Sequence, residues 1–224
     1  MISFDSSTDA AELRDAHRTL LTPSFRPGEL VPEHDFVAQL GEGGEVLLAR
    51  DQDGRMLGAA VAQPFGDAVL LEYLVAAPSS RGRGVGSGLL SAFLDRWSGS
   101  VMLAEFDRPD VQSPHPVHGD PAARLRFYAR FGALALDLPY FQPPVSEHNS
   151  REHGMLLAVF DRDGRIAERG ALDARQQRAV QHYLHEILEA ADDPDARRLR
   201  AAAEPDGLRA IPLEDYARIA RSPL

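Results

Sequence analysis

Apolar positions along the chain follow two spacings, and each spacing predicts a type of secondary structure. Leu13, Ala16 and Leu20 recur at helical intervals within residues 8–20, and residues 31–40 form a second short helical pattern. Short apolar runs between turn residues are typical of strands. Such runs occupy residues 45–50, 56–63, 68–76, 101–106, 133–138 and 155–160.

Helical patterns also lie between the later strands. One covers residues 85–97. Another begins at Asp120-Pro121, a pair typical of a helix N-cap and first turn, and ends at Gly132. Strands that alternate with helices predict a mixed α/β architecture, an α+β arrangement around a mixed sheet.

The end of the chain has a different pattern. After residue 165 every periodic segment is helical, and Val180, Tyr183, Leu184 and Leu188 share one stripe. We therefore expect one domain over residues 1–164 and a helical C-terminal extension over residues 165–224. The stripe suits packing on that domain, and a possible homodimer interface is the alternative.

Composition narrows the range of functions. The 224 residues are 44% hydrophobic and 26% charged, which is typical of a globular chain. No run of about 18 apolar residues is present, so no membrane partner is expected. The N-terminus lacks the pattern of a secretory signal, which favours a cytoplasmic location. The net charge of −10 disfavours nucleic acid as a partner.

Two missing residue types exclude several chemistries. The chain has no cysteine, and hence no disulfide, no thiol nucleophile and no cysteine-based metal site. It also has no lysine, which excludes a Schiff-base lysine and a Walker-type phosphate loop. The histidines do not have the spacing of metal ligands, so no metal is expected.

A glycine-rich turn at residues 81–88 carries the clearest chemical signal. It follows the apolar strand at residues 68–76 and opens an apolar helix, and it contains Arg81, Arg83 and four glycines. Glycines allow the backbone to approach a ligand closely, and the free amides at a helix N-terminus attract anions. The turn therefore predicts a phosphate-binding site.

The dinucleotide-binding pattern GxGxxG does not fit this turn in any register. One feature keeps a dinucleotide-dependent oxidoreductase as an alternative. Glu105 ends the next strand about twenty residues further on, where an acid that binds ribose is expected.

Two segments resemble the GNAT superfamily of acyl-CoA-dependent N-acetyltransferases. The first comprises the strand end Tyr73-Leu-Val-Ala-Ala-Pro78, the turn Arg81-Gly-Arg-Gly-Val-Gly86 and the helix start Ser87-Gly-Leu-Leu90. The second is the helix Ala122-Ala-Arg-Leu-Arg-Phe-Tyr-Ala-Arg-Phe-Gly132. The resemblance covers residues up to about Phe160 and implies a GNAT-like fold, which the C-terminal extension follows.

The resemblance also implies how the acyl donor, acetyl-CoA, binds. The backbone of Leu74 and Val75 is expected to pair with the pantetheine arm, as an edge strand pairs with an extended ligand. The turn is expected to bind the pyrophosphate through Arg81, Gly82, Arg83, Gly84, Val85, Gly86 and Ser87.

Transfer to an amine requires a base. An alkylamine with a pKa near 10.4 is neutral in only about one part in a thousand at pH 7. Glu72 is the first candidate because a carboxylate within an apolar strand is unfavourable unless it has a function or a partner. A paired or edge-exposed glutamate with a structural role is the alternative. Glu105 is the second, as base or as an acceptor-binding group. The resemblance implies that Tyr128 protonates the departing thiolate, and simple packing is the alternative.

These residues predict transfer of an acetyl group from acetyl-CoA to a small-molecule or peptide amine, by direct attack in a ternary complex. The alternative is a catalytically inactive module that binds CoA or a nucleotide as a sensor or scaffold. The loops at residues 108–119 and 139–153 are expected to set acceptor specificity, with His115, His118, His148 and His153 as candidate lining residues.

Overall fold

The computed structural model describes residues 2–26, 28–41, 43–115, 119–145, 150–189 and 191–222. The chain divides into two compact units. The first contains the described residues of Met1–Pro64, Val69–Gly99 and Val145–Asn149, and the second those of Phe65–Ala68, Ser100–Pro144 and Ser150–Leu224. Each unit combines strands with helices, so the expected mixed α/β class is confirmed.

The first unit contains four strands in the order β1-β2-β3-β4. β1 pairs antiparallel with β2, and β2 pairs antiparallel with β3. The strands are β1 (Ser3–Ser7), β2 (Glu45–Arg50), β3 (Met56–Phe65) and β4 (Ala68–Ala76). The helices are α1 (Ala10–Ala16) with its π-helical continuation η1 (His17–Leu21), α2 (Glu33–Gly41), the 3-10 turn η2 (Pro78–Ser80) and α3 (Val85–Arg96).

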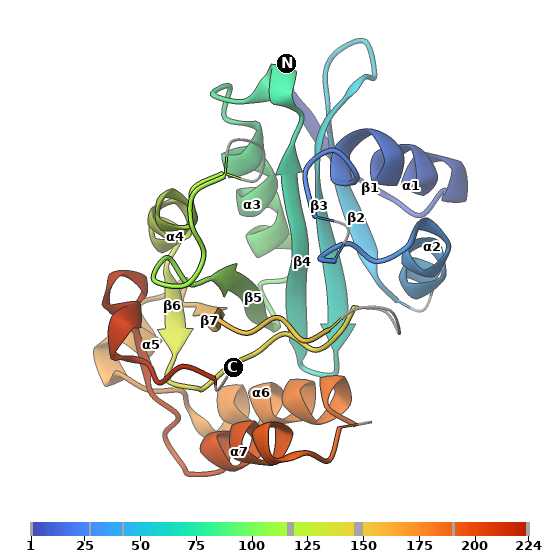
Figure 1. The fold of residues 1–224 in the computed structure, drawn as a ribbon. Helices are drawn as coiled ribbons and strands as arrows, with labels where there is room; N and C mark the ends of the chain where they lie inside the picture. Colours follow the sequence, from blue (N-terminus) through green and yellow to red (C-terminus); the bar gives the residue numbers. More distant parts are fainter. Residues whose placement is uncertain are drawn as a thin grey trace. The chain divides into compact units, whose positions relative to one another are not determined.

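Helices cover both faces of these strands. Figure 1 shows α1 and α2 on one face of β2 and β3, where Leu20 and Phe36 join a buried cluster with Val61. α3 packs on the opposite face. A Cβ on Gly58 of β3 would lie 3.0 Å from a methyl carbon of Val85 and of Leu89, so this glycine allows the close approach of α3.

The second unit contains four strands in the order β5-β7-β6-β8, and each adjacent pair is antiparallel. The strands are β5 (Val101–Asp107), β6 (Ala133–Leu136), β7 (Met155–Phe160) and β8 (Ala210–Pro212). The helices are α4 (Pro121–Ala129), α5 (Arg165–Arg169), α6 (Ala174–Ile187), α7 (Pro194–Ala203) and the 3-10 turn η3 (Leu213–Arg218). α6 and α7 lie side by side (Figure 1).

The C-terminal segment is not helical throughout, contrary to the sequence-based prediction. After α7 the chain forms β8, in which Ile211 pairs with Ala135 of β6. A strand of three residues depends on backbone pairing and gives almost no periodic signal. The boundary between residues 164 and 165 stays a prediction, since the described part of the segment belongs to the same compact unit as β5, β6 and β7.

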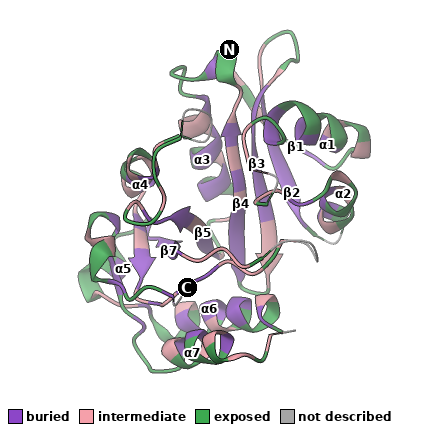
Figure 2. Ribbon diagram, in the orientation of Figure 1, coloured by how far each residue is buried: buried purple, intermediate pink, exposed green. Residues whose placement is uncertain are grey.

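The apolar stripe of α6 is buried within the chain itself. Val180, Tyr183, Leu184 and Leu188 are each at most 1% exposed, and Figure 2 shows the buried positions of α6 alternating with exposed ones. The stripe therefore packs internally, and a homodimer stays a prediction with no surface assigned to it. Within the described residues, no helix combines the length and apolarity that crossing a membrane requires.

Candidate active site

The glycine turn leads from η2 into α3. Gly82 and Gly84 have φ angles of 75° and 79°, in the left-handed region that disfavours residues with a Cβ. Gly84 is the N-cap of α3 and gives it no side-chain hydrogen bond. The helix therefore begins without the side-chain cap that would occupy its first amides.

The first turn of α3 presents free main-chain amides. Gly88 N donates to Gly84 O at 2.9 Å, so the preceding amides of Val85, Gly86 and Ser87 have no acceptor within the helix. A Cβ built on Gly86 meets no atom within 4 Å, and the same is true at both glycines of the preceding turn. Unsatisfied amides beside open space, at the positive end of a helix dipole, suit an anion.

Two arginines add positive charge to this turn. Arg81 and Arg83 are exposed, and among the described residues neither forms an ion pair. Arg96, at the other end of α3, is by contrast paired with Glu45 at 3.0 Å. No described carboxylate therefore neutralises the guanidinium groups of the turn, and they reinforce its attraction for an anion.

β4 brings Leu74 and Val75 close to this turn. The carbonyl oxygen of Val75 lies beside β3, because a Cβ on Gly58 would be only 2.5 Å from it. Polar groups of successive residues in a strand point to opposite sides. The backbone groups of Leu74 therefore point away from β3, which favours Leu74 over Val75 as the residue that pairs with an extended ligand.

Glu72 is half-buried and accepts a hydrogen bond from Nε2 of Gln39 in α2 at 3.2 Å. Its neighbour Tyr73 faces the core, where its hydroxyl accepts from the amide of Val31 and donates to the carbonyl of Glu29, each at 3.1 Å. The two side chains lie on opposite faces of β4, as the alternation of a strand requires. The bond to Gln39 gives Glu72 a neutral structural partner.

Tyr128 of α4 lies in the second unit against an aromatic wall. Its ring stacks on Phe106 of β5, with centroids 4.4 Å apart, and meets Phe160 of β7 edge-on. Burial raises the pKa of Tyr128 to about 12, and the neighbouring charge of Arg124 acts weakly in the opposite direction. The hydroxyl therefore stays protonated at neutral pH, and it forms no hydrogen bond within the described part of the chain.

Glu105 of β5 is surrounded by three neutral donors. Its Oε2 accepts from Nε2 of Gln142 at 2.7 Å. Its Oε1 accepts from the hydroxyl of Tyr140 and, at 3.3 Å, from that of Tyr183. Burial raises the pKa of the Glu105 carboxyl, and the three hydrogen bonds lower it by a smaller amount. Since Glu105 and Phe106 are consecutive in a strand, Glu105 and Tyr128 lie on opposite faces of β5.

The sequence pattern did not point to Tyr140, Gln142 or Tyr183 as site residues. Tyr183 is part of the apolar stripe of α6, which predicts packing only, and the other two residues lie in a proline-rich loop. The one usable signal was the carboxylate of Glu105 in an apolar strand, which requires hydrogen-bond donors from elsewhere.

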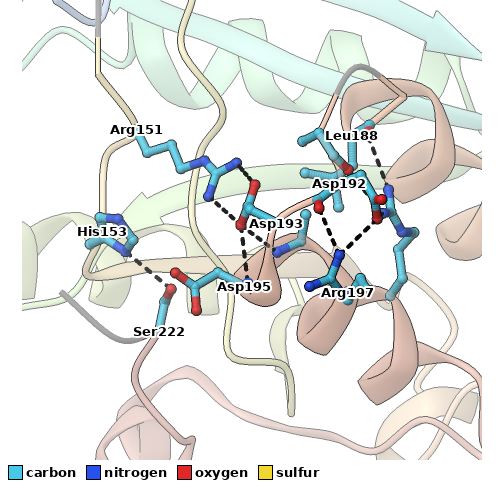
Figure 3. A network of polar contacts seen from close by, with 11 residues as sticks. Arg151, His153, Leu188, Asp192, Asp193, Asp195, Arg197 and Ser222 are labelled. Atoms are coloured by element: carbon cyan, nitrogen blue, oxygen red, sulfur yellow. Dashed lines mark hydrogen bonds and ion pairs between the residues drawn. The ribbon is translucent and has the colours of Figure 1, made fainter.

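Part of the loop at residues 139–153 is anchored to the C-terminal segment (Figure 3). Arg151 forms a two-bond ion pair with Asp193, the N-cap of α7, and lies over the ring of Phe141. The hydrogen bond from Arg151 holds the pKa of the Asp193 carboxyl well below its usual range. Nδ1 of His153 lies 3.1 Å from Oγ of Ser222.

Of the other candidate loop histidines, the structure describes only His115. The backbone of His115 bridges to Gly119, while His118 and His148 lie outside the described residues. Lining of an acceptor pocket by these histidines stays a prediction. Among the described residues, no three His, Asp or Glu side chains lie close enough to hold a metal ion.

The candidate residues thus fall into two sets. The turn at residues 81–87, Leu74, Val75 and Glu72 belong to the first unit, and Glu105 and Tyr128 belong to the second. The first unit thus contributes a turn whose amides and charge suit an anion, and the second contributes a carboxyl and a phenol whose pKa values are raised by burial.

Comparison with protein families identifies one match. Residues 42–132 match the family model of the acetyltransferase (GNAT) domain. This range contains the glycine turn, Glu72, Glu105 and Tyr128, and ends at Gly132. No curated protein has significant sequence similarity to the chain.

Solved structures share the fold at low sequence identity. A structure from Bacteroides thetaiotaomicron, assigned to the GNAT family of acetyltransferases, is 20% identical, with 85% of this chain and 99% of that chain covered and a TM-score of 0.62. The loading GNATL domain of CurA from Lyngbya majuscula is 18% identical, with coverages of 72% and 98% and a TM-score of 0.51. The ribosomal-protein-S18-alanine N-acetyltransferase from Escherichia coli is 17% identical, with coverages of 71% and 93% and a TM-score of 0.50.

Proposed function

We propose that the chain is an acetyltransferase of the GNAT family, which transfers an acetyl group from acetyl-CoA to an amine acceptor by direct attack in a ternary complex. The observation that supports this most strongly is the glycine turn before α3. Within the part of the chain that the structure describes, its first amides have no acceptor and Arg81 and Arg83 form no ion pair, and with the open space beside Gly86 they suit a diphosphate. Acetyl-CoA carries such a group together with a thioester.

Different residues of the chain bind different parts of acetyl-CoA. The amides of Val85, Gly86 and Ser87 hold the pyrophosphate, with Gly82 and Gly84 allowing the turn its left-handed backbone. Arg81 and Arg83 supply charge, and the backbone of Leu74 holds the pantetheine arm. When bound, acetyl-CoA supplies an acyl carbon for attack and a thiolate leaving group. The new carbon–nitrogen bond replaces the carbon–sulfur bond, one ammonium proton goes to a base and one proton goes to the thiolate.

Glu105 has the chemistry of the base. Burial raises its carboxyl pKa, and a base works best when its pKa lies nearer the operating pH. Its partners are all hydrogen-bond donors, which leaves the ionised carboxylate as the form they stabilise. Glu72 is the second candidate, with Gln39 as its partner.

Tyr128 serves the leaving group as a hydrogen-bond donor. Proton transfer from a phenol with a pKa of about 12 to a thiolate with a pKa of about 8.5 is uphill by roughly 5 kcal/mol. Donation of a hydrogen bond has no such barrier and still stabilises the negative sulfur. Tyr128 therefore stabilises the thiolate, and water delivers the final proton.

A thiol-release assay tests the proposal. The full chain is incubated with acetyl-CoA and a panel of amines and peptides, free CoA is measured with a thiol reagent, and products are identified by mass spectrometry. We expect release that depends on an amine and an acetylated amine as product. Binding of acetyl-CoA by calorimetry without release for any acceptor would indicate a binding module instead. Absence of binding would reject the acetyl-CoA assignment.

A further inference from the structure

The hydrogen bonds around Glu105 include one from the C-terminal segment. Tyr183 lies in α6, beyond residues 42–132, and its hydroxyl is 3.3 Å from Oε1 of Glu105 and 3.0 Å from the hydroxyl of Tyr140. Glu105 and Tyr183 are 78 residues apart in the chain. A residue beyond the range that the family model matches therefore reaches a side chain within that range.

When Glu105 is ionised, as the base of the proposed reaction, the number of protons fixes the direction of these bonds. Each tyrosine hydroxyl carries one proton, and an ionised carboxylate carries none. Tyr140 makes the short hydrogen bond to Oε1 of Glu105, which uses its proton. Tyr183 must therefore be the donor in its contact with Tyr140, and its proton is shared between the Tyr140 hydroxyl and Glu105. Burial, the largest cause, and the nearby carboxylate raise the pKa of Tyr140 well above its usual value, so Tyr140 keeps this proton.

The ring of Tyr183 is fixed independently of its hydroxyl. The side chain is 1% exposed and its ring meets Phe65 edge-on, with centroids 5.0 Å apart. α6 itself begins with a capping box between Asp173 and Gln176. Because packing and capping already determine where the ring lies, the buried hydroxyl is available to orient a neighbour.

We propose that the C-terminal segment completes the acceptor site, with Tyr183 as a positioning residue that orients Glu105 and Tyr140 through its hydroxyl. The proposal rests on the proposed function in one respect, that Glu105 acts on the acceptor amine. Tyr183 stabilises the ionised form of Glu105, both directly and by strengthening the bond from Tyr140.

The described surroundings of Glu105 contain no charged side chain that duplicates this role. β7, whose Leu157 lies opposite Glu105, carries no titratable side chain. On β5, Asp107 is paired with Arg124 of α4. On α6, His182 is paired with Glu186 at 2.6 Å, and both are exposed. Among the described residues, no cation pairs with Glu105, so neutral donors alone hold it.

The test measures the titration of Glu105 itself. The full chain is labelled with ¹³C at the glutamate carboxyl carbons, and the Glu105 signal is identified by its loss in Glu105→Gln. Removal of a donor from the charged form raises a carboxyl pKa. In Tyr183→Phe, which keeps the ring, we expect the pKa of Glu105 to rise by roughly one unit. Tyr140→Phe, which removes the closer donor, is expected to raise it further.

Tyr216→Phe is the matched control, because Tyr216 lies in the same C-terminal segment and its ring contacts Arg108, not Glu105. It is expected to leave the titration unchanged. In the enzyme assay, the acid limb of the pH profile of kcat/KM for the amine should shift to higher pH in Tyr183→Phe. The KM for acetyl-CoA should stay unchanged. An unchanged or lowered Glu105 pKa in Tyr183→Phe would overturn the proposal. The titration requires no activity, so absence of acetyl transfer would reject the proposed function and leave this test intact.

Discussion

Gly88 of α3 lies against the ring of Phe4 in β1, so closely that a Cβ at position 88 would be 2.2 Å from Cζ of that ring. The last glycine of the glycine-rich sequence therefore serves packing within the first unit. Gly86, two residues earlier, faces open space. Glycine is therefore required at position 88 for packing and at position 86 for open space beside the helix start. Alanine substitutions at the two positions distinguish these two roles.

Gly88→Ala is expected to destabilise the protein. The new methyl group overlaps the Phe4 ring, and overpacking of this kind costs about 1–3 kcal/mol. Urea unfolding measures the loss. The double variant with Phe4→Ala tests the cause, since removing the ring should make the two changes less than additive. Full additivity would show that another contact is responsible.

Gly86→Ala is expected to leave stability unchanged or to raise it by up to ~1 kcal/mol, because alanine favours a helix and meets no atom there. Its methyl group does enter the space beside the free amides. We therefore expect weaker binding of acetyl-CoA, measured by calorimetry, together with an unfolding midpoint that is unchanged or raised. Equal affinity for acetyl-CoA in wild type and variant would place the diphosphate elsewhere.

Arg81→Glu is expected to weaken acetyl-CoA binding roughly 10- to 100-fold, the effect of losing one charge-assisted contact to a phosphate. The effect should shrink as salt concentration rises. Arg178→Glu, at an exposed position of α6, makes the same change in net charge and serves as control. If both variants bind alike, overall charge and not the turn determines affinity.

Tyr128→Phe is expected to lower turnover by about 100-fold, the low end of what one positioned hydrogen-bond donor to a developing negative charge contributes, with little change in acetyl-CoA affinity. The ring stacking on Phe106 is kept, so the melting temperature should stay within error. Because the pKa of Tyr128 is about 12, wild type should show no loss of turnover from this residue up to about pH 10. Unchanged turnover in the variant would remove Tyr128 from the reaction.

Local patterns were sufficient to predict most strands. β2, β4 and β7 have the expected bounds, because each is a buried apolar run between turn residues. β1 was not predicted, since Ser3–Ser7 is mostly polar and exposed and pairs along its backbone with β2 at the edge of the strands. An edge strand with little buried surface gives no periodic signal.

The candidate site also has one part that local sequence patterns predict and one part that they do not. The glycine turn and the start of α3 were predictable because the glycines, the arginines and the apolar helix are consecutive in sequence, and anion binding by the turn stays a prediction. The environment of Glu105 was not, because its donors Tyr140, Gln142 and Tyr183 are 35, 37 and 78 residues away. Contacts of this kind depend on how β5, the loop after β6 and α6 pack, which no local pattern encodes.

The carboxyl of Glu105 also gives a prediction about stability. Its folded-state pKa is raised, chiefly by burial, whereas in the unfolded chain it titrates near its ordinary value of about 4.3. The stability that the neutral form contributes is therefore fully present below that ordinary value and is lost as pH rises through the folded-state pKa.

The variant Glu105→Gln isolates this effect, because its side chain is neutral at every pH and all its other titrating groups are those of the wild type. The difference in unfolding free energy, wild type minus variant, should accordingly fall with rising pH and then level off. Urea unfolding of both proteins across pH 4 to 9 measures it, and a difference that is constant or rises with pH would contradict the burial of this carboxylate.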